Sequence, residues 1–332
     1  MFIVENYGVA ILLCVITMLC WGSWANTTKL IDRTWRFELF YWDYVVGILL
    51  CTLLLAFTLG SHGNEGRSFT DDLKQADASN ILTAALGGII FNLANILLVA
   101  AIGIAGMSVA FPVGIGIALV LGVIVNYISN PQGNPVLIFG GVALIVLAII
   151  LNARAYQKLQ TNSTEKVSGK GLLISVISGC LMGFFYKYVA VSMVTDFKVP
   201  EAGKLTPYTA LVFFAVGIVI SSFLFNTIQM RRPFTGSPVS FAVYFKGKTR
   251  DHLVGILGGV IWSFGMSFNI IASGKAGPAI SYGLGQGATV VAAIWGIFVW
   301  KEFDKAPSST KSLLNIMLGL YVIGLALIII SK

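Results

Sequence analysis

Charged residues are scarce in this sequence. Of its 332 residues, only 11% are Asp, Glu, Lys or Arg, whereas 57% are hydrophobic. A soluble domain has about 25% charged residues, so this chain has too few charges to cover a water-facing surface. The mean hydropathy of +0.86 agrees with this reading. The composition therefore excludes an ordinary soluble protein and predicts a membrane protein.

Cysteine and histidine are also few, and this excludes several kinds of chemistry. The four cysteines lie inside apolar runs without a C-x-x-C pair, so neither a disulfide framework nor a zinc site is expected. His62 and His252 lie in loops or at the edges of apolar runs, and the sequence has no H-E-x-x-H and no G-x-S-x-G. We therefore expect no enzyme, no metal and no cofactor. The "GKT" at Gly247–Thr249 is no P-loop, because Ala242 replaces its first glycine.

Ten apolar runs are long enough to cross a bilayer, since a spanning helix needs about 20 mostly apolar residues. The predicted spans are residues 9–29, 37–60, 80–103, 107–127, 135–152, 171–194, 206–229, 253–273, 277–300 and 312–331. The first lacks a basic n-region and an A-x-A site, so we do not expect a cleaved signal peptide. The predicted fold class is an all-α membrane protein with ten transmembrane helices, surrounded by the lipid bilayer.

The net charge of +8 comes from Lys and Arg spread over loops, so no nucleic-acid partner is expected. With the N-terminus outside, the cytoplasmic loops 30–36, 104–106, 153–170, 230–252 and 301–311, together with Lys29, carry fifteen Lys and Arg, against six on the other side. Cytoplasmic loops are the ones enriched in Lys and Arg. The sequence therefore predicts a multi-pass protein of the plasma or inner membrane with both termini outside.

The two halves of the chain resemble each other. A shift of 171 residues aligns Leu86–Tyr127 with Leu257–Phe298, and eleven of 42 positions are identical. Six of these are glycines, where chance gives about 1.5. Five spans in each half would invert the second half, which is the architecture of secondary transporters with a site near the midplane. The predicted domains are a five-helix repeat over residues 1–153, a cytoplasmic linker over 154–170 and a second five-helix repeat over 171–332.

Proline and glycine interrupt the repeats at matched positions. The candidates for hinges or close packing are Pro112, Gly114, Gly116, Gly283, Gly285 and Gly287. Proline removes a helical donor and glycine loosens a helix, and matched interruptions point to a substrate site and its moving parts. The alternative is that these glycines only let helices approach closely in lipid.

Three charged residues fall inside predicted spans, where a charge costs about 2.5–3.5 kcal/mol at the midplane and suggests function. Asp43 lies six residues into its span, and we expect it to bind the coupling proton; the alternative is a buried carboxylate bonded to Tyr or Trp. Glu38 lies in the first turn of the same span and can reach water. Lys187 lies near the outer end of the sixth span and can extend to water. We expect Glu38 and Lys187 to serve as a gate or in an ion pair.

Polar and aromatic residues form stripes on three spans, at spacings of three, four and seven that place them on one helix face. The candidate substrate-binding residues are Asn92, Asn95, Trp262, Asn269, Tyr282, Gln286 and Thr289. An aromatic plate with hydrogen-bonding groups suits a small, flat, polar molecule. The alternative for each residue is a hydrogen bond to another helix.

Several stretches resemble the ureide permeases of the drug/metabolite transporter superfamily. They are "YWDYVVGILLCTLLLAFTLG", with Asp43–Tyr44, the run "GGIIFNLAN" from Gly87 to Asn95, the "GMS" at Gly106–Ser108, and "AIWGIFVWKEF". The resemblance covers nearly the whole chain. It implies ten spans and proton-coupled uptake of small polar solutes, such as allantoin or uracil. Plant members also have a long central loop with a proposed nucleotide-binding motif; residues 152–170 are short and lack it.

The sequence thus predicts a secondary active transporter that takes up a small polar solute by proton symport, most simply a ureide or an oxo-purine or pyrimidine heterocycle. A sugar carrier of the glucose, ribose or rhamnose type stays open, and a drug or metabolite exporter is a weaker alternative. The expected partners are the solute, protons and lipid. A homodimer stays open.

Overall fold

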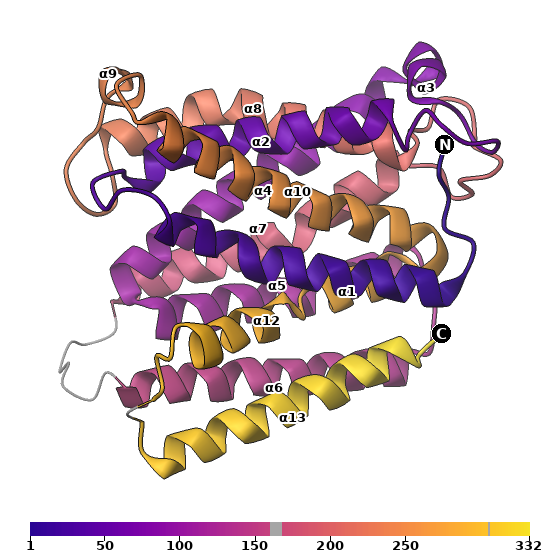
Figure 1. Ribbon diagram of the computed structural model, residues 1–332. Helices are drawn as coiled ribbons and strands as arrows, with labels where there is room; N and C mark the ends of the chain where they lie inside the picture. The colour runs from indigo at the N-terminus through magenta and orange to yellow at the C-terminus, as the bar shows by residue number, and fades with distance from the viewer. Residues whose placement is uncertain (160–167, 305) are drawn as a thin grey trace.

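The computed structural model describes residues 1–159, 168–304 and 306–332 (Figure 1). Ten helical segments in this part of the chain are long and apolar enough to span a membrane, which confirms the predicted all-α membrane fold. The helices are α1 (Tyr7–Ser23), η1 (Trp24–Lys29), α2 (Phe37–Phe57), α3 (Phe69–Gln75), α4 (Ala78–Ala105), α5 (Met107–Ser129), α6 (Pro135–Leu159), α7 (Gly169–Ser192), α8 (Pro207–Arg231), α9 (Phe241–Tyr244), α10 (Thr249–Ala276), α11 (Pro278–Gly285), α12 (Ala288–Ile294), the π-helical η2 (Trp295–Val299) and α13 (Ser308–Ile329).

The spanning helices run roughly parallel or antiparallel, so the bundle has two ends (Figure 1). We call end A the end at which α2, α7 and α10 begin; the short helix α9 lies there. End B is the opposite end, with α3 and both chain termini (Figure 1). The helices α2 and α8 pack together, and α6 packs on α13 at the opposite edge of the bundle.

Most predicted spans agree with the observed helices within four residues, and the fifth is the exception. The helix α6 continues to Leu159 instead of ending at residue 152. The prediction ended the span where the apolar run ends, but the residues "NARAYQKL" that follow are mostly good helix formers and continue the helix. The middle of the predicted linker, residues 160–167, lies outside the described residues, and α7 begins at Gly169.

Glycines bring helices of the two halves into backbone contact at matched places. A Cβ at Gly47 would lie 2.2 Å from the carbonyl oxygen of Ile256, and one at Gly259 would lie 1.9 Å from that of Tyr44. Likewise, a Cβ at Gly217 would lie 2.1 Å from the carbonyl oxygen of Ala85, and one at Gly88 would lie 2.0 Å from that of Phe214. Two of these contacts join α2 to α10, and the other two join α8 to α4. Within lipid, where burial no longer drives packing, such close approach supplies the dispersion contacts that hold helices together. These four positions therefore require glycine.

Two further glycines turn the chain between consecutive spans. Gly106 separates α4 from α5 with a φ of 79°, and Gly277 separates α10 from α11 with a φ of 90°. An L-residue rarely adopts these angles, whereas glycine adopts them freely. The two positions correspond under the 171-residue shift. Beyond them the helices differ: α5 is continuous, whereas the ninth span is divided into α11, α12 and η2.

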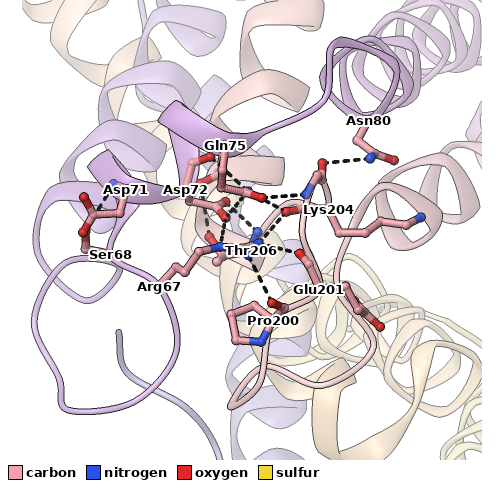
Figure 2. Close-up of polar contacts among 12 residues, drawn as sticks. Arg67, Ser68, Asp71, Asp72, Gln75, Asn80, Pro200, Glu201, Lys204 and Thr206 are labelled. Carbon is pink, nitrogen blue, oxygen red and sulfur yellow. Dashed lines mark hydrogen bonds and ion pairs between the residues drawn. The ribbon is translucent and has the colours of Figure 1, made fainter.

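A buried ion pair holds two loops together at end B (Figure 2). The carboxylate of Asp72 is fully buried and accepts hydrogen bonds from Arg67 Nε at 2.8 Å, Gln75 Nε2 at 3.0 Å and the backbone N–H of Thr206 at 2.7 Å. Arg67 also donates to the backbone carbonyls of Pro200, Glu201 and Lys204. The loop that contains α3 is thereby fixed to the loop before α8.

Candidate functional site

A cavity of about 130 Å³ lies within the bundle. It is lined by Trp21, Trp24, Phe91, Asn95, Leu98, Phe111, Ile115, Met182, Phe185, Trp262, Gln286, Ala288, Thr289 and Ala292. These residues come from α1, η1, α4, α5, α7, α10 and the ninth span, and thus from both halves of the chain. Most of them lie near the middle of their helices. Others, such as Trp24 and Leu98, lie nearer to end A.

Aromatic rings form most of the cavity wall, with Trp262 at their centre. The ring of Phe91 lies 4.5 Å from that of Trp262, and the two residues correspond under the 171-residue shift. The indole of Trp21 lies 5.9 Å from that of Trp262, with 12° between their planes, and its Nε1 donates to the carbonyl of Trp262 at 3.2 Å. Aromatic faces bind flat rings and the apolar faces of sugars, so the wall suits a ring-shaped solute.

Asn95, Gln286 and Thr289 provide the polar groups of the cavity. Asn95 Nδ2 donates to the hydroxyl of Tyr41 at 3.3 Å, and Thr289 Oγ1 donates to the carbonyl of Gln286 at 3.0 Å. Among the described residues, the side-chain amide of Gln286 has no hydrogen-bond partner. It lies at the turn between α11 and α12, where the ninth span is interrupted. An amide with a free donor and a free acceptor can fix the orientation of a polar solute.

No lining residue is charged, so in the described part of the chain this cavity offers neither a carboxylate nor an ammonium group to a solute. A charged solute would lose its hydration without gaining a partner, at a cost of several kcal/mol. The cavity therefore fits a neutral solute better than an ion.

Between the cavity and end B, hydrogen bonds among buried side chains join four helices in what we call the end-B seal, which includes two residues predicted to bind substrate, Asn269 and Tyr282. Tyr186 donates its hydroxyl hydrogen to Asn269 Oδ1 at 2.8 Å, and Asn269 Nδ2 donates to the carbonyl of Ser281 at 2.7 Å. The hydroxyl of Tyr282 lies 3.1 Å from the carbonyls of Ala118 and Met182. Asn269 and Tyr282 are fully buried and do not line the cavity, because their polar atoms join α5, α7, α10 and α11.

Asn92 likewise joins helices instead of facing the cavity. Its Oδ1 accepts a hydrogen bond from Tyr41 at 2.8 Å, and its Nδ2 donates to Ser221 and Ser222 at 2.7 and 3.0 Å. The side chain is fully buried between α2, α4 and α8. Of the seven predicted substrate-binding residues, Asn95, Trp262, Gln286 and Thr289 line the cavity, and Asn92, Asn269 and Tyr282 do not.

Asp43 lies outside the cavity, in the end-A half of α2, and is 3% exposed. The hydroxyl of Tyr244 in α9 donates to its Oδ1 at 2.7 Å, and His252 Nδ1 in α10 lies 3.0 and 2.9 Å from its two oxygens. Burial and the neighbouring Asp43 carboxylate raise the pKa of the Tyr244 hydroxyl. His252 was not predicted as the partner of Asp43, although α2 and α10 both begin at end A and place the two residues at similar depth.

The other two charged candidates also lie away from the cavity. Glu38 is buried instead of water-facing, and its carboxylate binds Arg36 through Nη2 at 2.6 Å and Nε at 3.1 Å. Arg36 also donates to the carbonyls of Thr235 and Ser237 in the loop after α8. Lys187 is half-buried in the end-B half of α7 and makes no hydrogen bond or ion pair within the described residues.

The interrupting residues occupy different surroundings. The helix α5 continues through Pro112 and Gly114, where the carbonyl of Gly114 would lie 2.5 Å from a Cβ at Gly179. Gly116 has no atom near the Cβ position. In the ninth span, Gly283 and Gly287 face aliphatic side chains of Val123, Ile328, Leu325 and Met18. A Cβ at Gly285 would lie 2.9 Å from Trp21 and from Asn269, so this glycine lies between the cavity wall and the end-B seal.

The cavity residues that sequence reasoning missed are Trp21, Trp24, Phe91, Leu98, Phe111, Ile115, Met182, Phe185, Ala288 and Ala292. They are aromatic or aliphatic, as are most residues of a membrane helix, so their composition does not distinguish the cavity from lipid contacts. One available signal was the match of Phe91 with Trp262 in the repeat.

Comparison with known proteins identifies the family. A family model described as sugar transport protein matches residues 12–332. Ureide permease 4 and ureide permease 1 of Arabidopsis thaliana are 23% and 25% identical, and each alignment covers 100% of this chain and 99% of the relative.

Two more distant matches agree with the same fold. The glucose uptake protein of Bacillus subtilis is 24% identical over 73% of this chain and 75% of its own length. A crystal structure with a TM-score of 0.55 and 14% identity covers 96% of this chain and 95% of its own, which shows the fold alone. The chain therefore belongs to the sugar transport protein family and is a multi-pass membrane transporter of a small solute.

Proposed function

We propose that this chain is a secondary carrier for a small, neutral heterocycle with amide-type hydrogen-bonding edges, of the ureide, oxo-purine or pyrimidine kind. The observation that carries the proposal is the cavity itself, which is aromatic, uncharged and equipped with the free amide of Gln286. An apolar cavity of about 150 Å³ binds benzene, so a cavity of about 130 Å³ suits one small ring. The full-length match to ureide permeases supports the same solute class.

A sugar is the second candidate, because the family model and the glucose uptake relative carry that name. A hexose has five hydroxyl groups, whereas the cavity offers polar side chains only at Asn95, Gln286 and Thr289. Each buried hydroxyl without a partner costs about 1–3 kcal/mol, which favours the heterocycle. A cationic drug is less well supported, since no acid lines the cavity.

Solute flux in proteoliposomes distinguishes these candidates. We expect purified protein to exchange radiolabelled uracil or allantoin, and Gln286→Ala to reduce this exchange about tenfold or more, the effect of losing one or two buried hydrogen bonds. Uptake of glucose or rhamnose that neither uracil nor allantoin inhibits would establish the sugar alternative instead.

The alternating-access mechanism rests on two inverted five-helix repeats, over residues 1–153 and 171–332. The matched glycine contacts support this architecture: Gly47 meets α10 as Gly217 meets α4, and Gly259 meets α2 as Gly88 meets α8. The cavity lies between the halves, as expected for such a carrier. Rocking of the halves would separate Tyr282 of α11 from Ala118 of α5, the seal contact that joins the two halves, and so open a path toward end B while the cavity closes toward end A.

Proton symport through Asp43 supplies the driving force in this proposal. Asp43 is buried beside groups that can exchange a proton, and a neutral carboxyl group costs less to sequester from water than a carboxylate. Coupling requires that solute binding and protonation favour each other, a linkage that acts in both directions. A homodimer remains a prediction and is not needed for this cycle.

End A is cytoplasmic and both termini are outside in this proposal, because the loops at end A carry most Lys and Arg. We expect an impermeant maleimide to label Asn64→Cys at end B in intact cells, and Ser240→Cys at end A only after permeabilisation. Both positions are exposed loop residues. Thr164, in the predicted linker, should also be protected, although it lies outside the described residues. Labelling of Ser240→Cys in intact cells would reverse the orientation.

A further inference from the structure

Asp43 and His252 form a buried pair that the cavity does not contain. The imidazole Nδ1 contacts both carboxylate oxygens, at 3.0 and 2.9 Å, and Tyr244 donates to one of them. The pair joins α2 of the first half to α10 of the second. A histidine against a carboxylate is an arrangement in which a proton can be held by either group.

The groups in contact with the pair are aromatic, and the charged side chains nearby bind other partners. The loop before α2 contributes the ring of Trp35, 5.0 Å from that of His252, and α9 contributes Tyr244, with its ring 4.8 Å from the imidazole. Asp251 and Lys248 lie nearby on the α10 side, and both bind Asp32. Asp251 accepts a hydrogen bond from the backbone N–H of Asp32, and Lys248 donates to the carboxylate of Asp32. Asp43 and His252 therefore interact chiefly with each other.

The two members of the pair differ in access to water. The side chain of Asp43 is 5% exposed, whereas that of His252 is 23% exposed. Gly247 lies beside the imidazole: a Cβ there would lie 2.6 Å from Nε2 and 2.3 Å from the ring of Trp35, so any larger residue would press on the imidazole. The imidazole thus stands between the carboxylate and the water at end A.

The pair is also connected to the cavity through the packing of α2 and α10. Tyr44, next to Asp43, places its ring 4.7 Å from that of the cavity residue Trp24. On α10, a Cβ at Gly255 would lie 2.5 Å from Cβ of Asp43, so the helices touch at this level. Trp262 follows Gly255 by seven residues on the same helix, about 10 Å along its axis. A change in the pair acts on two helices that position the cavity aromatics.

We propose that His252 is the proton relay between Asp43 and the water at end A, a role that rests on the proposed proton-coupled transport. When Asp43 is protonated, its O–H bond breaks and the proton forms a bond to Nδ1, which leaves a carboxylate and an imidazolium. Nε2 then gives its proton to water. The neutral imidazole that remains donates Nδ1–H to the carboxylate. The starting tautomer returns when Nε2 takes a proton from water and Nδ1 releases its own proton to water, with no net change in the number of bound protons.

The test compares four variants in proteoliposomes with two assays, counterflow of radiolabelled uracil and its accumulation on an inward proton gradient. His252→Gln keeps a hydrogen bond but cannot carry a proton, and Asp43→Asn mimics the protonated acid. For both variants we expect measurable counterflow, whereas accumulation should fall about tenfold or more. A positioned acid or base typically contributes at least about a hundredfold to proton transfer, so tenfold is a low expectation. His252→Arg keeps the ion pair but stays protonated, so its accumulation should remain low. His62→Gln, at end B, should match wild type.

The outcomes separate the relay from the proposed function. If wild-type protein shows no counterflow of uracil, allantoin or glucose, the proposed function fails. If wild type accumulates solute and Asp43→Asn does not, but His252→Gln accumulates it like wild type, the relay is wrong while the coupling site stands. Recovery of accumulation in His252→Arg would also overturn the relay, because a fixed positive charge would then suffice. Retained counterflow shows that each variant is folded.

Discussion

Replacing Arg67 with methionine is expected to lower the free energy of unfolding by about 3–5 kcal/mol, the usual cost of removing one partner of a buried ion pair. Asp72 is fully buried, whereas the side chain of Arg67 is 19% exposed. Without the guanidinium group, the carboxylate keeps only the donors of Gln75 and Thr206, and the carbonyls of Pro200 and Glu201 lose their partner, whereas that of Lys204 still accepts from Gln75 (Figure 2). A buried charge that is left uncompensated is the main source of the loss.

Thermal unfolding of the purified protein in detergent measures this effect. The double variant Arg67→Met with Asp72→Asn should regain part of the lost stability, since the charge that lacked a partner is also gone. Lys74→Met is the matched control in the same loop between α2 and α4: its partner Asp71 lies 2.9 Å away, and both side chains are mostly exposed. Exposed pairs contribute little. A melting temperature of Arg67→Met equal to that of Lys74→Met would show that the end-B network does not hold the loops.

The spans were predictable because the bilayer acts on every residue of a helix. Twenty apolar residues in sequence identify a span whatever its neighbours are, and all ten predicted spans correspond to observed helices. The ends were less certain, as α6 shows, because a helix can continue into polar residues beyond the hydrocarbon core.

The roles of polar residues inside the spans were harder to predict. In lipid, each buried amide or hydroxyl group needs a partner, and the sequence does not show whether another helix or a solute provides it. Asn92 and Asn269 have their partners on neighbouring helices, whereas the amide of Gln286 is free. Only the three-dimensional packing separates these cases.

The interruption of the ninth span was predicted, but its counterpart was not found in α5. Pro112 lies in the second turn of that helix, where the loss of one donor leaves the rest of the helix intact. In the ninth span, three alternate glycines surround Gln286, and the chain leaves the α-helix there. Glycine adds backbone freedom and no side-chain packing. The ninth span has glycine at all three of these positions, whereas α5 has Pro112, Gly114 and Gly116 there, so the ninth span is the weaker helix.

Gly285→Leu is expected to abolish transport while the protein still reaches the membrane. A Cβ at this position would lie 2.9 Å from both Trp21 and Asn269, closer than normal contact. Leucine adds three more carbon atoms, which must enter the cavity or displace the seal toward end B. Overpacking of this kind costs about 1–3 kcal/mol, which a membrane helix can tolerate, but the cavity would lose its shape.

Gly114→Leu tests the same argument on α5, and Gly319→Leu on α13 is the matched control. A Cβ at Gly114 would lie 2.8 Å from Leu98, a cavity residue, and the backbone there faces Gly179 of α7, so leucine should also abolish uptake. Gly319 has no atom within 4 Å of its Cβ position and is exposed on the bundle surface, so leucine there should leave uptake unchanged. The measurement is uracil counterflow per molecule of protein in the membrane. Normal counterflow in Gly285→Leu would mean that this glycine does not shape the substrate path, since a side chain of that size cannot share the space with Trp21 and Asn269 as they are now placed.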